Sequence, residues 1–395
     1  MTPDYRGLDR DGPTPLPVRH DERVSDPIDE FSFLSEQAGE AGIDAPAPHG
    51  ERLTLDLPDG RTLSALRYSP ADAPDAAPVV TFLHGAGLNA HTWDTTILAL
   101  GLPALAVDLP GHGDSSWRDD LAYVARVLAP DVAAGIAAWT DAPQLLVGQS
   151  LGGLTAAAVA ASRPELVREL VVIDITPGID PNAGPTQIRD FFAGPVDWAS
   201  RDELVDRALS FGLGGGTRRK AERGVYFNSR VRSDGRVEWK HHFAHLANAA
   251  STPSVLRQAQ QPVGAQAQPV PEQQPVPEQQ PVPEQQPVPE QQPVPEQQPV
   301  PEPVEGQDAV TSVLGESGWQ DLAGVAVPTT LIRGERGYVT EEDAAEFLRR
   351  VPEASVVTVS SGHNVQEEIP IELGGRLRTL AGGDGTGRFR DDGKP

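Results

Sequence analysis

Cysteine is absent from this chain of 395 residues, and methionine occurs once. Without thiols, the chain can form no disulfide framework, no thiolate zinc site and no cysteine nucleophile. Basic residues are also scarce: 32 Lys and Arg stand against 57 Asp and Glu, and the formal net charge is −25. This acidity should repel nucleic acid and anionic membrane surfaces, so we expect neither as a partner. Solubility, or a high-salt or high-GC genomic bias, is the simplest explanation of it.

A long apolar segment of the kind found in signal peptides is also missing, since residues 1–30 carry scattered charges and prolines. The uncharged stretch of residues 142–162 is long enough to span a bilayer, but its Gln, Ser, Thr and repeated Gly residues make it a poor membrane helix. We therefore expect a soluble, cytoplasmic protein. The sequence leaves its oligomeric state open.

Strand-like and helix-like stretches alternate around what we interpret as one core. Residues 1–50, rich in Pro, Gly and acidic side chains, are predicted to form a largely disordered arm, although the apolar cluster at residues 31–34 could dock on a surface that the sequence does not identify. A hairpin pattern follows, and then apolar runs alternate with helical stretches over residues 51–178 and again over residues 308–381. This αβ rhythm predicts a parallel sheet.

The rhythm breaks between these two parts of the core. Residues 179–257 contain helical segments with many aromatic residues, which suggests an inserted cap. Residues 258–307 are rich in Pro, Glu and Gln, and Pro-Val-Pro-Glu-Gln-Gln recurs in five full hexads over residues 269–298. Such a tract cannot build a packed core, and we interpret it as a tolerated loop expansion rather than a proline-rich ligand for a partner. The tail, residues 382–395, is predicted to be disordered.

The most informative stretch is Gln-Leu-Leu-Val-Gly-Gln-Ser-Leu-Gly-Gly at residues 144–153, where an apolar run stops in a glycine-flanked serine. It predicts a strand, a sharp turn and a helix, with Gly148 and Gly152 removing side chains where strand and helix approach. Ser150 would then stand at the tip as a nucleophile, and the N–H of Leu151 could face an oxyanion. The alternative is a purely structural turn.

A serine hydroxyl needs a base that a carboxylate orients. His363 follows the last predicted strand, so it should lie at the same sheet edge as Ser150. Two carboxylates satisfy the chain order: Asp174 ends the strand after the serine turn, and Glu335 follows the first strand after the insertion. Asp174 has the better local case because it emerges directly from a buried strand, whereas Glu335 shares its turn with Arg336. Glu335 stays open as the alternative.

A second oxyanion donor is predicted in the glycine-rich turn His84-Gly85-Ala86-Gly87, where the N–H of Ala86 can approach a ligand closely. An ordinary strand-end turn is the alternative. His112 could contact substrate, although a structural role fits it better. His241 and His245 are one helical turn apart, but no carboxylate completes a metal-binding pattern, so we expect neither a metal nor a cofactor.

Four signatures occur in a fixed order: His-Gly-x-Gly at 84–87, Asp-Leu-Pro-Gly-His-Gly-Asp-Ser at 108–115, Gly-Gln-Ser-Leu-Gly-Gly at 148–153 and Gly-His at 362–363. In this order and separation they resemble the α/β-hydrolase superfamily. The resemblance covers about residues 51–380, apart from the proline tract. It implies an α/β fold with an eight-stranded, mostly parallel sheet flanked by helices, and a helical cap inserted after the sixth strand.

The chain departs from the usual pattern of that superfamily at one position. Most members carry the acid three residues beyond the glycine that ends the seventh strand, and here that position is Gly337. The turn instead resembles a subgroup of short-acyl esterases with the acid after the sixth strand, in an Asp-Ile-x-Pro context that residues 174–177 match. The resemblance therefore also favours Asp174. A serine at the nucleophile position argues against haloalkane dehalogenases and epoxide hydrolases.

These residues predict a cofactor-independent serine hydrolase that cleaves a small carboxylic ester, thioester or lactone through an acyl-enzyme. Ser150, His363 and Asp174 would form the catalytic triad, and the N–H groups of Ala86 and Leu151 would hold the oxyanion. A C–C bond hydrolase or a cofactorless perhydrolase could use the same triad. A weakly catalytic, ligand-binding or partner-recruiting protein is the alternative from another class. The sequence does not identify the substrate.

Overall fold

The computed structural model of the chain describes residues 29–179, 194–211, 216–245 and 318–382. The predicted proline-rich repeat lies outside the described residues, as do the first 28 residues and the tail beyond Gly382. In the part of the chain that is described, no helix has both the length and the apolar character needed to cross a bilayer.

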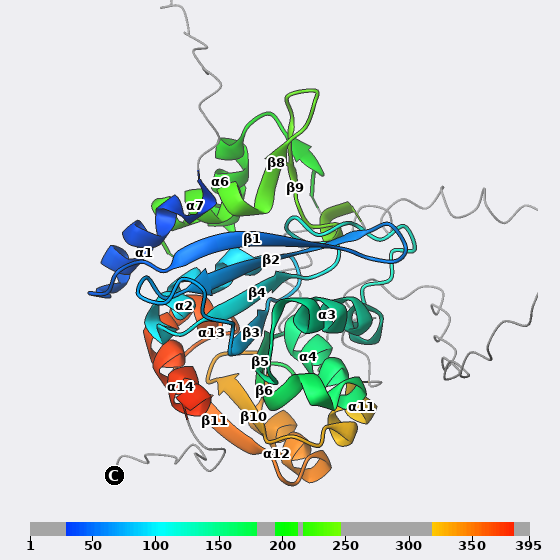
Figure 1. Cartoon of the computed structure of the whole chain (residues 1–395). Helices are drawn as coiled ribbons and strands as arrows, with labels where there is room; N and C mark the ends of the chain where they lie inside the picture. The colour runs from blue at the N-terminus through cyan, green and yellow to red at the C-terminus, as the bar shows by residue number, and fades with distance from the viewer. Residues whose placement is uncertain (1–28, 180–193, 212–215, 246–317, 383–395) are drawn as a thin grey trace, which may run out of the picture.

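An eight-stranded sheet runs through the centre of the core (Figure 1). Its strands are β1 (His49–Asp56), β2 (Thr62–Ser69), β3 (Val80–Leu83), β4 (Ala104–Asp108), β5 (Gln144–Gln149), β6 (Val167–Ile173), β10 (Thr329–Gly334) and β11 (Ser355–Val359). They lie in the order β1-β2-β4-β3-β5-β6-β10-β11. β2 pairs antiparallel with β1 and β4, and all other neighbours are parallel. The predicted eight-stranded, mostly parallel sheet is confirmed.

Helices cover both faces of this sheet (Figure 1). One face carries α3 (Ala125–Trp139), α4 (Leu151–Ser162), α11 (Gly318–Gly324) and α12 (Glu341–Arg350), and the other carries α1 (Leu34–Ala41), α2 (Asp94–Leu100) and α14 (Pro370–Gly382). In β5, Leu146 packs against the first set, whereas Leu145 and Val147 pack against the second. Because successive side chains of a strand point to opposite faces, a strand covered on both must be apolar throughout. This accounts for the uninterrupted apolar runs in the sequence.

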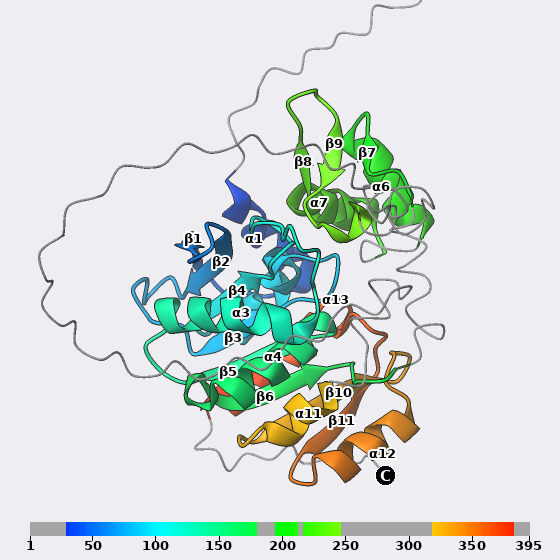
Figure 2. The same ribbon diagram turned by 90° about the vertical axis from the view of Figure 1, so that its right-hand side faces the viewer.

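The region that the sequence predicts to be a cap follows β6, the sixth strand along the chain. Its described residues form α6 (Arg201–Ser210), α7 (Arg218–Asn228) and a small antiparallel sheet of β7 (Asp197–Trp198), β9 (Val237–Trp239) and β8 (Ser229–Val231), which group together in Figure 2. The sequence predicts a helical cap, and the three short strands are an addition to it. Asp234-Gly235, with Gly235 at φ 81°, is a hairpin signal that indicates the turn between β8 and β9.

The N-terminal segment differs from its prediction. The sequence predicts a largely disordered arm up to residue 50, yet residues 30–41 form η1 (Glu30–Phe33) and α1, and β1 begins at His49. The apolar cluster explains this order, because Leu34 is 1% exposed in the core and Phe31 packs edge-on against Tyr68. A few buried side chains thus order a segment whose overall composition is polar.

His91 of η2 (Ala90–Trp93) lies between this N-terminal segment and the cap and contacts both. The imidazole Nδ1 lies 3.0 Å from Asp94 Oδ2, and Nε2 lies 3.2 Å from Glu30 Oε2. Its ring stacks on Phe227 of α7, with ring centroids 3.7 Å apart. Burial opposes protonation, but the Asp94 and Glu30 carboxylates outweigh it and raise the pKa of His91 to about 9.

A pH-dependent loss of stability is expected from this arrangement. The folded-state pKa of His91 lies above its ordinary value of about 6.5. Its contribution to the free energy of unfolding is therefore complete below about pH 6.5 and disappears as the pH rises through about 9. The free energy of unfolding, measured by thermal unfolding, should decrease by up to about 3 kcal/mol between pH 6 and pH 9.5. The His91→Gln variant is the control, because it should be less stable at pH 6 and should lose less over the same range. An equal stability difference between the two proteins at both pH values would contradict the assignment.

Candidate active site

Ser150 stands at the sharp turn between β5 and α4. Its backbone adopts φ 53°, which is unfavourable for a residue with a side chain, and its N–H donates to the carbonyl oxygen of Ile173 at 3.0 Å. A Cβ atom on Gly152 would lie 2.3 Å from the Leu83 carbonyl oxygen, and one on Gly148 would lie 2.2 Å from the Gly152 carbonyl oxygen. The predicted reason for both glycines, a close approach of strand and helix, is confirmed.

His363 lies in the loop between β11 and α13 (Val365–Glu368), and its Nδ1 is 2.8 Å from Oδ2 of Asp174. The Asp174 side chain is fully buried and that of His363 is 10% exposed. The ring of Tyr338 stacks on the imidazole, with centroids 3.6 Å apart and planes 14° from parallel. Asp174 and Tyr338 together restrict both the position and the tilt of the imidazole.

The Asp174 carboxylate has three hydrogen-bond partners. Besides His363, it accepts hydrogen bonds from the backbone N–H of Gly334 at 3.0 Å and of Tyr338 at 2.6 Å. A Cβ atom on Gly337 would lie 2.2 Å from Asp174 Oδ1. The carboxylate therefore fills the space that a side chain at position 337 would need. Asp174 has φ 48°, a second unfavourable backbone conformation at this edge of the sheet.

Glu335, the alternative acid, lies in a different environment. Its side chain is exposed, and its backbone N–H donates to the Val359 carbonyl oxygen. In the described part of the chain, its side chain makes no hydrogen bond to His363. The structure thus brings His363 to Asp174 and leaves Glu335 at the surface.

The turn from Gly85 to Leu88, which we call the oxyanion loop, lies beside Ser150. The N–H of Leu88 donates to the Gly85 carbonyl oxygen at 3.2 Å, and Gly87 adopts φ 76°, as the third residue of a type II turn does. The N–H of Gly87 donates to Nε2 of His112 at 3.0 Å. Burial lowers the pKa of His112 to about 3, so its imidazole is neutral and can accept this bond. His112 therefore supports the loop from within the core.

The two predicted oxyanion donors lie at different places around the serine. Ala86 is in the oxyanion loop and lines the same cavity as Ser150, and Leu151 is the first residue of α4, directly after Ser150. Ser150 and His363 both line this cavity, although no hydrogen bond joins their side chains in the described residues. Such contacts often form only when substrate is bound.

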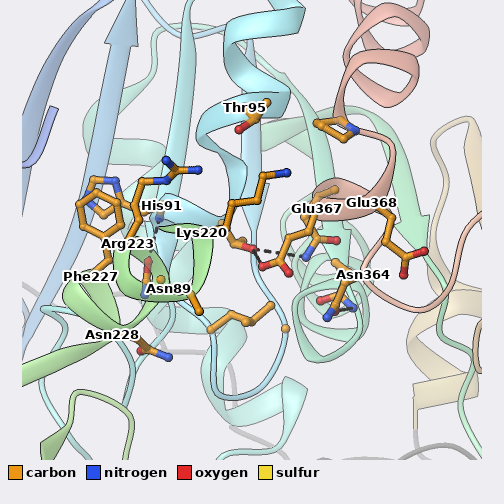
Figure 3. Close-up of a pocket in the computed structure, with 18 of the residues that line it drawn as sticks. Asn89, His91, Thr95, Lys220, Arg223, Phe227, Asn228, Asn364, Glu367 and Glu368 are labelled. Atoms are coloured by element: carbon orange, nitrogen blue, oxygen red, sulfur yellow. Dashed lines mark hydrogen bonds between the residues drawn. The ribbon is translucent and has the colours of Figure 1, made fainter. Parts of the chain in front are cut away.

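The cavity has a volume of about 440 Å³ and lies between the core and the cap (Figure 3). Lys220, Arg223, Phe227 and Asn228 of α7 line one side, and Asn364, Glu367 and Glu368 line the other (Figure 3). Gln37 and Glu40 of α1 complete the wall, so the N-terminal segment also contributes to the cavity. A space of this size suits a small ligand.

Sequence reasoning missed several residues of this site, namely Tyr338, Asn228, His91 and the α1 side chains. The apolar cluster at residues 31–34 was a signal for the docking of α1. No pattern in the sequence indicates that Tyr338 stacks on His363, or that Asn228 reaches the oxyanion loop, because both contacts join distant parts of the chain.

Among the described residues, no group of three or more His, Asp or Glu side chains is arranged to hold a metal ion. His241 is buried and stacks on Trp239, with ring centroids 5.5 Å apart, whereas His245 is partly exposed. The two histidines therefore lie in different surroundings.

Comparison with known proteins places this geometry in a family. The family model of the alpha/beta hydrolase family matches residues 82–373. An esterase of Mycobacterium tuberculosis, Rv0045c, is 31% identical over 355 residues, which cover 88% of this chain and 93% of that protein. A pimeloyl-[acyl-carrier protein] methyl ester esterase of Neisseria meningitidis is 44% identical over 102 residues, 25% of this chain and 36% of that protein.

Solved structures agree with these matches. The crystal structure of Rv0045c superposes with a TM-score of 0.61 and 30% identity, covering 90% of this chain and 98% of that chain. An E-2-(acetamidomethylene)succinate hydrolase superposes with a TM-score of 0.58 at 21% identity, which is evidence for the fold alone. The signatures, the sheet topology and these matches lead to one conclusion: the chain belongs to the alpha/beta hydrolase family.

Proposed function

We propose that the protein is a serine esterase that cleaves a small carboxylic ester, or a related thioester or lactone, through an acyl-enzyme. The observation that carries the proposal is the 2.8 Å contact between His363 Nδ1 and Asp174 Oδ2 at the cavity that Ser150 lines. A histidine held in this way presents Nε2 as a base. The 31% identical relative, itself an esterase, supports the same reaction class.

In the proposed reaction, Ser150 Oγ attacks the substrate carbonyl carbon while His363 Nε2 accepts the hydroxyl proton. The N–H groups of Ala86 and Leu151 bind the oxyanion, and each such donor contributes about 2.7 to 4 kcal/mol to transition-state stabilisation. His363 then protonates the leaving alcohol, and water releases the acid by the reverse sequence. Asp174 orients the imidazole and stabilises the imidazolium that forms.

The cap, which we assign to residues 179–257, would select the substrate. Its helix α7 forms one wall of the cavity and brings Phe227 next to charged and polar groups. A small ester with both apolar and polar parts fits such a lining better than a long alkyl chain.

Labelling with a fluorophosphonate probe tests the proposal. We expect the wild-type protein to be labelled at one serine and to hydrolyse p-nitrophenyl acetate, and the Ser150→Ala variant to remain unlabelled. If the folded wild-type protein shows neither labelling nor turnover, it is not a serine esterase. Labelling that persists in Ser150→Ala would place the nucleophile elsewhere.

A further inference from the structure

Tyr338 lies in the turn after β10 and covers one face of the His363 imidazole. The two rings are 14° from parallel, and their centroids are 3.6 Å apart. His363 lines the cavity that contains Ser150, whereas Tyr338 is not among the residues that line it. The tyrosine can therefore act on the imidazole without touching a substrate in the cavity.

The backbone around Tyr338 is held on both sides of the residue. Its own N–H donates to Oδ2 of Asp174 at 2.6 Å, and the same oxygen is 2.8 Å from Nδ1 of His363. The next residue, Val339, is 1% exposed in the core, and its carbonyl oxygen accepts a hydrogen bond from Nε of Arg333 at 3.1 Å. The two stacked residues thus share one carboxylate oxygen as an anchor, which fixes their rings relative to each other.

The geometry of this stack suits a charged imidazole better than a neutral one. Two neutral aromatic rings repel face to face, and they prefer offset or edge-on contacts with centroids about 4.5 to 7 Å apart. A centroid distance of 3.6 Å between nearly parallel rings leaves little room for an offset. A cation, in contrast, is attracted to the negative face of an aromatic ring.

Three other histidines of the described residues stack on aromatic rings and allow a comparison. His91, whose pKa is raised to about 9 by two carboxylates, is protonated at neutral pH, and its centroid is 3.7 Å from that of Phe227. Burial lowers the pKa of His242 to about 4 and the pKa of His241 well below its ordinary value, so both are neutral. Their centroids lie 4.3 and 5.5 Å from those of the tryptophans on which they stack. The stack at the active site has the close spacing of the charged pair.

The tyrosine brings no charge of its own to the stack. Burial, followed by the nearby Asp174 carboxylate, raises the pKa of Tyr338 to about 12, so its phenol is neutral under ordinary assay conditions. In the proposed reaction His363 acts as a neutral base and becomes an imidazolium in the transition state. A ring face that favours only the imidazolium lowers the barrier without strengthening the binding of substrate.

We propose that Tyr338 is a positioning residue whose ring face stabilises the His363 imidazolium as it forms, an inference that rests on the proposed function. The proton moves from Ser150 Oγ to His363 Nε2 in acylation and from water to the same nitrogen in deacylation. Tyr338 favours the imidazolium in both steps. Loss of the ring face should therefore lower kcat and leave KM nearly unchanged.

Fluorination of the ring at position 338 tests this role, because each fluorine weakens the negative potential of the ring face and changes the shape of the ring very little. Tyr338→Phe is the reference, and its kcat for p-nitrophenyl acetate should stay within about twofold of wild type because it keeps the face. Phenylalanines that carry one, two and three fluorines are then placed at the same position. We expect kcat and the burst rate of p-nitrophenol release to decrease with each fluorine, by about threefold to tenfold in total, with KM unchanged.

Phe347 of α12 offers a matched control, because it is fully buried and does not line the cavity. The same fluorinated residues at position 347 should leave kcat unchanged. Tyr338→Leu, which replaces the ring face with an aliphatic side chain, should lower kcat by about fivefold to 30-fold. If this variant folds poorly, the fluorinated series still decides the question because it preserves the packing.

A flat kcat and burst rate along the fluorinated series at position 338 would overturn the inference, even if Tyr338→Leu lowers kcat, because the ring would then act through its shape alone. An equal decrease at position 347, or a change confined to KM, would overturn it as well. Failure of the proposed function is a different result, since the wild-type protein would then neither release a burst nor hydrolyse p-nitrophenyl acetate.

Discussion

An alanine at position 150 is expected to lower kcat for a small ester by about 10⁴- to 10⁶-fold, because the nucleophile and its acyl-enzyme are lost together. The fold should be unaffected. Ser150 Oγ makes no hydrogen bond to the described residues, and alanine keeps the Cβ atom, so the strain at φ 53° stays the same. The free energy of unfolding should therefore change by no more than about 0.5 kcal/mol.

Ser150→Gly provides a second comparison. It removes the same hydroxyl, so kcat should decrease as much, but a glycine accepts a positive φ without strain. This variant should gain about 1 kcal/mol in the free energy of unfolding, measured by denaturant titration. A residual kcat within tenfold of wild type in either variant would show that Ser150 is not the nucleophile, whatever the stability result.

The core and the edge that carries the site follow from local patterns in the sequence. An apolar run bounded by glycines predicts β5 and the turn at Ser150, because glycine lets the strand and the following helix approach closely. Parallel strands then bring their carboxyl ends to one edge, and for this reason Ser150, Asp174 and His363 can be assigned to one site although up to 213 residues separate them in the chain.

The parts that were not predicted depend on contacts between distant segments. The α1 helix has little apolar surface of its own, and it is held by Leu34 in the core and by the pairing of Glu36 and Glu40 with Arg223 of the cap. Likewise, no local pattern specifies the hydrogen bond from Asn228 to Gly87. Propensity and periodicity locate elements and strand ends, whereas the partner of a single side chain is set by tertiary packing.

For the carboxylate beside His363, which we propose as the triad acid, Asp174→Asn is expected to lower kcat by about 10⁴-fold. Three donors face this side chain, those of His363, Gly334 and Tyr338, and an amide has only one oxygen to offer them. If the NH₂ group faces His363, it forces Nδ1 to act as an acceptor and leaves Nε2 protonated, so the base is lost. If it faces Gly334, two donors meet in a buried space, which also destabilises the fold.

Glu335→Gln is the matched control, because it makes the same chemical change at the other carboxylate in the same assay. Its side chain is exposed and makes no hydrogen bond to His363 among the described residues, so kcat should stay within about twofold of wild type. A loss of activity in Glu335→Gln alone, with Asp174→Asn active, would exclude Asp174 as the triad acid.

An exchange of positions gives a further test of the same carboxylate. A Cβ atom on Gly337 would lie 2.2 Å from Asp174 Oδ1, so an aspartate there cannot coexist with the native carboxylate but could replace it. In the double variant Asp174→Gly with Gly337→Asp, the new side chain would extend from position 337 into the space that the Asp174 carboxylate had occupied. We expect kcat at least tenfold above that of Asp174→Gly alone, because stabilisation of the imidazolium depends on a carboxylate beside His363 and not on the strand that supplies it.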